Sequence, residues 1–142
     1  MAIEGKNFKL TATERDPHSF EYASGRHRLL MSKTMESDLP TTWFSPVDLL
    51  LSGIAGCLGM VIRTKMEEAG FDFEDLRLEI EGIRPDGADR VGLKSISTTV
   101  HIKTSADPAK VREIVEKSEE SCTVRNTLEF TPDFSLKVVL ES

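Results

Sequence analysis

Cysteine and histidine are scarce in this chain of 142 residues, which holds two cysteines and three histidines. Two thiols are too few for a disulfide scaffold, and a chain of this length can bury a core without one. Cys57 and Cys122 lie far apart in the sequence rather than in a CxxC pair, and the histidines show no ligand-like spacing. A structural zinc site is therefore not expected.

Long apolar runs are also missing, because no stretch of about 18 consecutive apolar residues occurs. Residues 1–9 lack the apolar segment and cleavage site of a signal peptide. We therefore expect a cytoplasmic protein with no membrane span. The formal charge is -6 and the basic residues are scattered, so we expect no binding of nucleic acid, which requires a basic face. Neither a glycine-rich phosphate loop nor a nucleophilic serine elbow is present.

The pattern of apolar residues predicts strands and two helices in an order that does not alternate regularly. Because no repeats or low-complexity linkers interrupt this pattern, we predict one domain over residues 1–142, of the α+β class. The predicted strands are residues 6–13, 18–23, 27–33, 73–83, 96–103 and 134–140. The predicted helices are residues 46–68 and 108–121, with a loop over 34–44 and a short turn over 122–128.

The first predicted helix has the clearest boundaries. Ser45 can cap its N-terminus, Pro46 suits its first position, and Asp48 completes a capping box. Gly70 suits the left-handed residue that ends it. The first half of this helix is apolar nearly all round, which favours burial on most sides.

Three glycines lie inside this apolar half, and each costs about 0.5–1 kcal/mol relative to alanine. They therefore indicate close approach by another backbone or by a ligand. The glycines are Gly53, Gly56 and Gly59.

The two cysteines are either inert core residues or a redox pair. Cys57 can be a small buried hydrophobe, because free cysteine is among the most buried residue types. Its neighbours Gly56 and Gly59 leave room for a ligand beside the sulfur. Cys122 lies where the second predicted helix ends. A second thiol close to an oxidised cysteine can condense with its sulfenic acid to form a disulfide. Two cysteines on adjacent core elements would match this chemistry.

A reactive thiol also needs a nearby cation to favour the thiolate. Cys57 lies too far along its helix for the helix dipole to help, so an arginine is expected to supply the charge. Asp48 could orient that arginine through a bidentate salt bridge, although its alternative role is the capping box with Ser45. The candidate arginines are Arg15, Arg26, Arg28 and Arg125, whereas Arg63 should point into solvent.

Two segments resemble the OsmC/Ohr family. Residues 45–57, Ser-Pro-Val-Asp-Leu-Leu-Leu-Ser-Gly-Ile-Ala-Gly-Cys, are similar to the family's central helix, in which a Pro-x-(Glu/Asp)-Leu-Leu-Leu stretch leads to a cysteine. Residues 119–128, Glu-Glu-Ser-Cys-Thr-Val-Arg-Asn-Thr-Leu, are similar to the segment that carries the second cysteine. The order and spacing of the predicted elements agree over nearly the whole chain.

The resemblance implies an OsmC-like fold, in which antiparallel sheets wrap around two central helices of an intertwined homodimer. It implies a thiol-dependent peroxidase that reduces organic hydroperoxides in the response to oxidative stress, with no metal or flavin cofactor. An external thiol would restore the enzyme. By similarity, Cys57 would be the peroxidatic cysteine and Cys122 the resolving cysteine, with Arg15 as the activating arginine and Asp48 as its partner.

The chain departs from the family pattern at two positions. Val47 stands where the Ohr branch usually has glutamate, and Thr123 stands where a proline often follows the second cysteine. These departures leave a second hypothesis open, namely a non-catalytic OsmC-like dimer that binds a small apolar ligand. A purely structural dimer is a third, although the glycines of the central helix would then have no purpose.

Overall fold

The structure is a computed structural model of the chain, and it describes residues 5–16, 19–32, 44–87 and 89–141. It contains two compact units, residues 1–50 and residues 51–142, and each is described by itself. His18, Lys33 and most of the loop predicted over 34–44 lie outside the described residues. The prediction of one domain over residues 1–142 stays a prediction.

The first unit contains a three-stranded antiparallel sheet in the order β1-β2-β3, with β1 at Thr11–Asp16, β2 at Ser19–Ser24 and β3 at His27–Ser32. Strands β2 and β3 form a tight hairpin, because Gly25 adopts the positive φ of 59° that such a turn requires. Strand β1 begins five residues later than the prediction of 6–13. Thr11 pairs with Ala23, one residue before the end of β2, so residues 6–9 lie beyond the strand with which β1 pairs.

Helix α1 spans Pro46–Glu68, as the sequence predicts. Its capping box is confirmed, since the Asp48 N–H donates to Ser45 Oγ over 3.1 Å and the Ser45 N–H donates to Asp48 Oδ2 over 3.0 Å. At the other end Gly70 has a φ of 73°. The Phe71 N–H donates to the carbonyl of Met66 and the Gly70 N–H to that of Glu67, which is the Schellman arrangement.

Only one stripe of α1 is buried in the described chain. The buried side chains recur every fourth residue at Ile54, Leu58, Ile62 and Met66, so they share one face of the helix. Met60, on another face, is 74% exposed. The prediction of burial on most sides is therefore wrong for this chain, because the elements of the second unit pack against a single face.

Helix α1 is also long and apolar enough to cross a membrane by length and composition alone. The core helix of a globular domain passes the same test, so one such helix is a weak indication. The prediction of no membrane contact stays a prediction.

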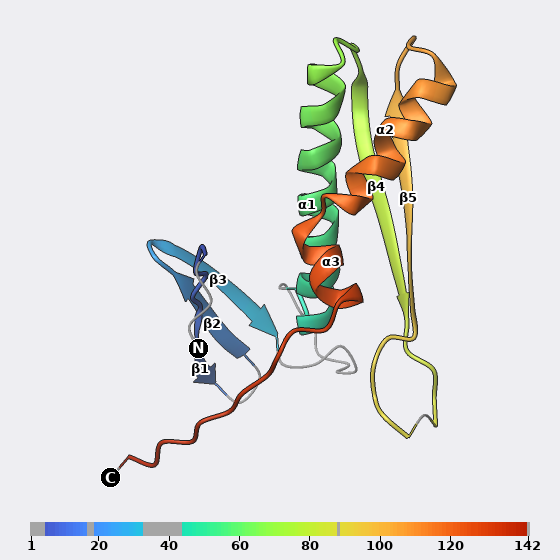
Figure 1. Cartoon of the computed structure of the whole chain (residues 1–142). Helices are drawn as coiled ribbons and strands as arrows, with labels where there is room; N and C mark the ends of the chain where they lie inside the picture. Colours follow the sequence, from blue (N-terminus) through green and yellow to red (C-terminus); the bar gives the residue numbers. More distant parts are fainter. Residues whose placement is uncertain (1–4, 17–18, 33–43, 88, 142) are drawn as a thin grey trace. The chain divides into compact units, whose positions relative to one another are not determined.

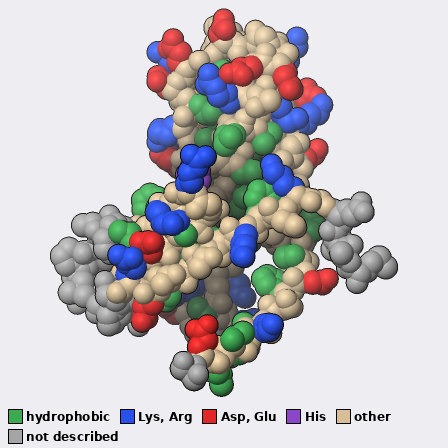
Figure 2. Space-filling view, turned by 90° about the vertical axis from the view of Figure 1, so that its left-hand side faces the viewer, with side chains coloured by type: hydrophobic (Ala, Val, Ile, Leu, Met, Phe, Trp, Pro, Cys, Tyr) green, Lys and Arg blue, Asp and Glu red, His purple; other side chains and the backbone are tan. Residues whose placement is uncertain are grey.

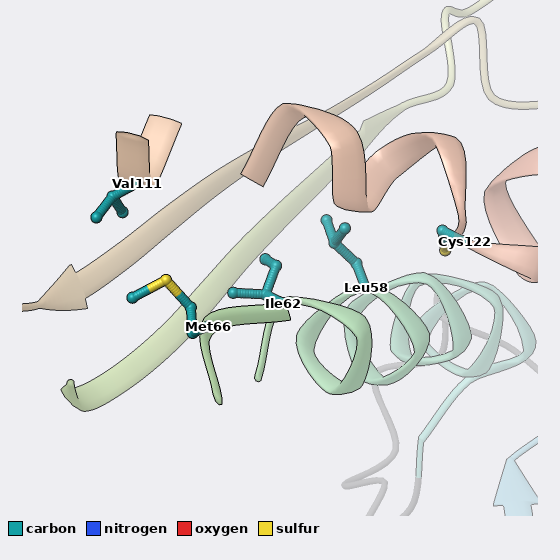
Figure 3. Close-up of a cluster of buried hydrophobic side chains, with 5 residues drawn as sticks. All are labelled: Leu58, Ile62, Met66, Val111 and Cys122. Atoms are coloured by element: carbon teal, nitrogen blue, oxygen red, sulfur yellow. The ribbon is translucent and has the colours of Figure 1, made fainter. Parts of the chain in front are cut away.

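The second unit packs α1 and α2 (Pro108–Glu120) with a two-stranded antiparallel sheet of β4 (Glu74–Ile83) and β5 (Ser95–Lys103). Figure 3 shows Leu58, Ile62 and Met66 of α1 in a row within the core, with Val111 of α2 near one end and Cys122 at the other. The predicted cap of α2 is confirmed, since Asp107 Oδ2 accepts from the Lys110 N–H over 3.3 Å. The predicted ranges of β4, β5 and α2 agree with the structure within about a residue.

Two predictions near the C-terminus are wrong. The turn predicted over 122–128 is a third helix, α3 (Thr123–Glu129). The strand predicted over 134–140 is absent. Residues 131–141 follow α3 as a segment without helix or strand, red in Figure 1. A strand requires a neighbouring strand for its backbone hydrogen bonds. Among the described residues, no strand pairs with this segment. Its apolar side chains, such as Phe134 and Leu136, are 85% and 91% exposed.

The surface carries both signs of charge. In Figure 2, lysine and arginine side chains are interspersed with aspartate and glutamate on the face shown. This distribution agrees with the scattered basic residues of the sequence.

Replacement of Ile62 by alanine tests the core. Because Ile62 is fully buried between α1 and the rest of the second unit, we expect Ile62→Ala to lower the free energy of unfolding by about 2–5 kcal/mol. Chemical denaturation measures this loss. Val91→Ala, at a site that is 79% exposed, is the control and should change stability by less than about 0.5 kcal/mol. Equal effects of the two substitutions would contradict this core.

Candidate active site

Cys57 lies in the middle of α1, on the side that faces the core. It is partly buried and packs against the cluster that includes Leu58 and Cys122. It directly precedes Leu58 in the sequence, so its sulfur lies beside the buried stripe rather than within it. A thiol in this position combines an apolar environment with partial access.

Cys122 lies at the corner between α2 and α3, and its side chain is fully buried. Its backbone N–H donates to the carbonyl of Glu119, and its own carbonyl accepts from the Asn126 N–H. The first bond belongs to the end of α2 and the second to the start of α3. Cys122 is therefore held by the backbone of both helices.

The structure brings the two thiols into hydrogen-bonding contact with each other and with the first turn of α3. The Val124 N–H is the main cause that lowers the pKa of Cys57, and the Cys122 thiol and the Thr123 N–H lower it further, against the effect of burial. Each of these groups donates to the sulfur and so favours the thiolate.

Cys122 responds in the opposite direction. Burial is the main cause that raises its pKa, and its hydrogen bond to Cys57 raises it further, because the donating thiol must keep its proton. The backbone N–H groups of Arg125 and Val124 oppose this shift. The pKa of Cys57 therefore lies below the ordinary value of a cysteine, and that of Cys122 lies above it.

A pocket of about 460 Å³ opens beside Cys122. Cys57 is not among its described lining residues, but Ile54 and Leu58, which lie on either side of Cys57 along α1, are. One part of its lining is apolar and includes Ile54 and Leu58 of α1 with Leu128 of α3, and another part is charged and includes Arg125. The pocket can therefore bury an alkyl group next to the thiol corner while its rim contacts polar groups.

The predicted arginines take different places. Arg125 lies in α3 and lines the pocket. Arg63 is 64% exposed, as predicted, and it pairs with Glu67. In the first unit, Arg15 lies at an irregularity of β1 and its Nη1 is 3.2 Å from Glu21 Oε2. Arg28 is paired with the same Glu21. The role of Arg15 as the activating arginine stays a prediction.

Asp48 takes part in the capping box of α1. The capping box is one of the two roles that the sequence leaves open for Asp48, and the salt bridge to an arginine is the other. A bidentate salt bridge from Asp48 to an arginine stays a prediction.

The three glycines of α1 show no forced close approach in the described residues. An added Cβ would lie 3.7 Å from Val124 Cγ1 at Gly53 and 3.5 Å from Leu78 Cδ1 at Gly59, and no described atom would lie within 4 Å of it at Gly56. The first two are ordinary contacts. The contact at Gly53 does show that α1 and α3 lie side by side near the thiols.

The sequence reasoning missed Thr123 and Val124. It expected a guanidinium to favour the thiolate, whereas the groups that lower the pKa of Cys57 in the described residues include two backbone N–H groups of α3. The segment after Cys122, for which the pattern predicts a turn, contains the signal for these donors. A helix that starts there leaves its first N–H groups without partners inside the helix.

Comparison with known proteins finds a protein family that this chain matches. A family model described as OsmC-like protein matches residues 40–137, which is more than half of the chain. The uncharacterized protein YmaD of Bacillus subtilis is 28% identical over 119 residues, covering 80% of this chain and 79% of that protein.

Solved structures show the same fold. The crystal structure of an OsmC like protein from Mycoplasma pneumoniae has a TM-score of 0.80 at 19% identity and covers 90% of this chain and 91% of its own. The organic hydroperoxide resistance protein OhrB of Bacillus subtilis has a TM-score of 0.58 at 20% identity, with 86% and 90% covered. The predicted OsmC-like α+β fold with antiparallel sheets is confirmed, and it contains three helices. The intertwined dimer stays a prediction.

The opposite shifts of the two thiols predict the order of their reaction with iodoacetamide. Because the pKa of Cys57 is lowered, its thiolate forms at a lower pH than that of an ordinary cysteine, and Cys57 should be alkylated first near neutral pH. Cys122, whose pKa is raised, should react only at higher pH or after unfolding. Mass spectrometry of peptides after a pH series of labelling measures both midpoints.

Two substitutions of Cys122 sharpen this measurement. Cys122→Ser keeps a hydrogen-bond donor, whereas Cys122→Ala removes it, so the labelling midpoint of Cys57 should rise more in the alanine variant. The midpoint should still lie below that of a free thiol in both variants, because the Val124 N–H remains. Preferential labelling of Cys122 in the native protein would contradict this description of the site.

Proposed function

Because the chain belongs to the OsmC-like protein family, we propose that it is a cysteine-based peroxidase that reduces organic hydroperoxides to alcohols in the response to oxidative stress. The observation that carries the proposal is the contact between Cys57 and Cys122, whose pKa values are shifted in opposite directions. A nucleophilic thiolate beside a protonated thiol is what such a reaction needs.

Cys57 carries out the first step. Its thiolate attacks the terminal oxygen of the hydroperoxide, the O–O bond breaks, and the released alkoxide takes up a proton to leave as an alcohol. The Cys57 sulfur is oxidised to a sulfenic acid, and the peroxide is reduced by two electrons. The N–H groups of Val124 and Thr123 support this step because they stabilise the thiolate before the attack.

Cys122 carries out the second step. Its sulfur attacks the sulfenic sulfur of Cys57, so that an S–S bond forms, the S–O bond breaks and water leaves with the thiol proton. Contact between the two thiols in the reduced state keeps the required movement short. An external thiol then reduces the disulfide through a mixed disulfide and supplies the two electrons that the peroxide consumed.

The pocket beside Cys122 supports an organic hydroperoxide as the substrate. Its apolar lining includes Ile54, Leu58 and Leu128, and burial of an alkyl chain contributes about 0.8 kcal/mol per methylene group. Hydrogen peroxide has no such group to bury. We therefore propose a preference for alkyl and aryl hydroperoxides.

The proposed assembly is a homodimer in the cytoplasm. Exposed apolar side chains on α1 and in the C-terminal segment, such as Met60 and Leu136 at 74% and 91%, are what a second copy would cover. A reducing cytoplasm suits two free thiols. The proposed chemistry uses these thiols alone, without a metal or flavin.

Peroxide turnover by cysteine variants tests the proposed function. We expect the rate of cumene hydroperoxide consumption to fall by about a thousandfold or more in Cys57→Ser, because this variant lacks the nucleophile. Cys122→Ser should complete one turnover and then stop, because the sulfenic acid formed on Cys57 has no resolving thiol in this variant. Mass spectrometry after one equivalent of peroxide should show a Cys57–Cys122 disulfide in the unmodified protein.

Two outcomes would reject the peroxidase. Unchanged turnover in Cys57→Ser would exclude Cys57 as the nucleophile. Thiols that stay unreactive toward peroxide, combined with tight binding of an apolar ligand, would favour the non-catalytic binder instead.

Substitution of Met60 tests the dimer. Light scattering should give twice the mass of one chain for the unmodified protein. Met60→Glu should shift it toward the monomer at low micromolar concentration, because a buried unpaired carboxylate opposes association. Val91→Glu, at a site that is also strongly exposed, should leave the mass unchanged. An unmodified protein that is monomeric at high concentration would contradict the proposed assembly.

A further inference from the structure

Helix α3 has few means of holding its own position. It spans seven residues, its first turn has no side-chain cap, and none of its side chains is fully buried. Isolated helices shorter than about 12–15 residues are marginal in water. The position of α3 must therefore depend on contacts with the rest of the second unit.

Two side chains of α3 tie it to the last turn of α2. Arg125 Nε lies 3.6 Å from Glu119 Oε2 of α2, and Arg125 Nη1 lies 2.7 Å from Glu129 Oε2 at the end of α3. Asn126 Nδ2 donates to the carbonyl of Glu120 over 2.9 Å. The guanidinium thus bridges the two helices at the corner where Cys122 lies, and Asn126 adds a second tie.

The same turn of α3 holds both sulfurs. The backbone N–H groups of Thr123 and Val124 donate to Cys57, and that of Arg125 donates to Cys122. Hydrogen bonds weaken steeply with distance and misalignment. A small displacement of α3 would therefore weaken every one of these bonds at once.

We propose that Arg125 is a positioning residue for the thiol pair, and that its ion pairs with Glu119 and Glu129 hold the first turn of α3 against Cys57 and Cys122. The Arg125 side chain acts through the backbone of α3, because its ion-pair partners are Glu119 and Glu129 and not a thiol. The inference deepens the proposed peroxidase, and its catalytic consequence rests on that function. Its effect on the thiols is measured without any peroxide.

A positioning role and a purely electrostatic role of Arg125 predict different results when Glu119 and Glu129 are replaced. If Arg125 acted only as a positive charge, Arg125→Gln would raise the labelling midpoint of Cys57, and loss of Glu119 and Glu129 would lower it. If Arg125 acts by position, both changes release α3 and both raise the midpoint. The double variant Glu119→Ala/Glu129→Ala therefore separates the two causes.

The experiment compares these variants by iodoacetamide labelling of Cys57 across a pH series. We expect the midpoint to rise by about half a pH unit or more in Arg125→Gln and in the double variant, which is about a threefold loss of thiolate below the midpoint. Arg63→Gln is the matched control, because Arg63 also pairs with a glutamate four residues on, Glu67, but lies in α1. Its midpoint should stay unchanged.

Further readouts separate position from general destabilisation. Exposed ion pairs contribute little to global stability, so the thermal midpoints of all four proteins should agree within a few degrees. Disulfide closure after one equivalent of peroxide should slow several-fold in Arg125→Gln. Asn126→Ala, which removes the second tie, should shift the midpoint in the same direction.

A midpoint that stays unchanged in Arg125→Gln, or that falls in the double variant, would overturn the positioning role. Failure of the proposed function looks different, because Cys57 of the unmodified protein would then not be oxidised by peroxide at all. A shift of the labelling midpoint without peroxide turnover would keep the positioning role and reject the peroxidase.

Discussion

The hydrogen bond from the Val124 backbone to the Cys57 sulfur connects the two parts of the thiol site. It is the largest cause of the lowered pKa of Cys57, and it comes from α3, whose N-cap residue is Cys122. A backbone donor cannot be removed by a side-chain substitution, and it needs no second charged group to be buried beside the sulfur. Its strength depends on the position of α3, so the geometry of the corner between α2 and α3 contributes to the lowered pKa of Cys57.

That geometry depends on the core of the second unit. The stripe from Ile54 to Met66 fixes the rotation of α1, since residues four apart share one face. With the stripe turned toward β4 and β5, Cys57 is partly buried against the same core cluster that contains Cys122. Gly53 then lies beside Val124, at a distance at which an alanine would make an ordinary contact. Core packing and the thiol contact are therefore consequences of the same orientation of α1.

The sequence predicts the parts of this arrangement that have local causes. The capping box at Ser45, the left-handed Gly70 and the cap at Asp107 each act within a few residues, and each was found from spacing alone. The pairing of Cys57 with Cys122 came from the resemblance to a family. Helix α3 was missed because it is short and has no side-chain cap or fully buried side chain, so its existence depends on tertiary contacts. The strand expected over 134–140 has the right alternation, but a strand also requires a neighbour, which no local pattern supplies.

The different environments of the two thiols fit the order of the two steps in the proposed peroxidase reaction. The thiol that meets the peroxide must be ionised and accessible, and Cys57 is the partly exposed member with the lowered pKa. The thiol that resolves must not compete for peroxide, and Cys122 is buried with a raised pKa. Oxidation of Cys57 removes the thiolate that accepts the Cys122 proton, and with it one cause of the raised pKa. In the proposed reaction the Cys122 thiol therefore ionises more easily after the first step than before it, while burial, the larger cause of its raised pKa, remains.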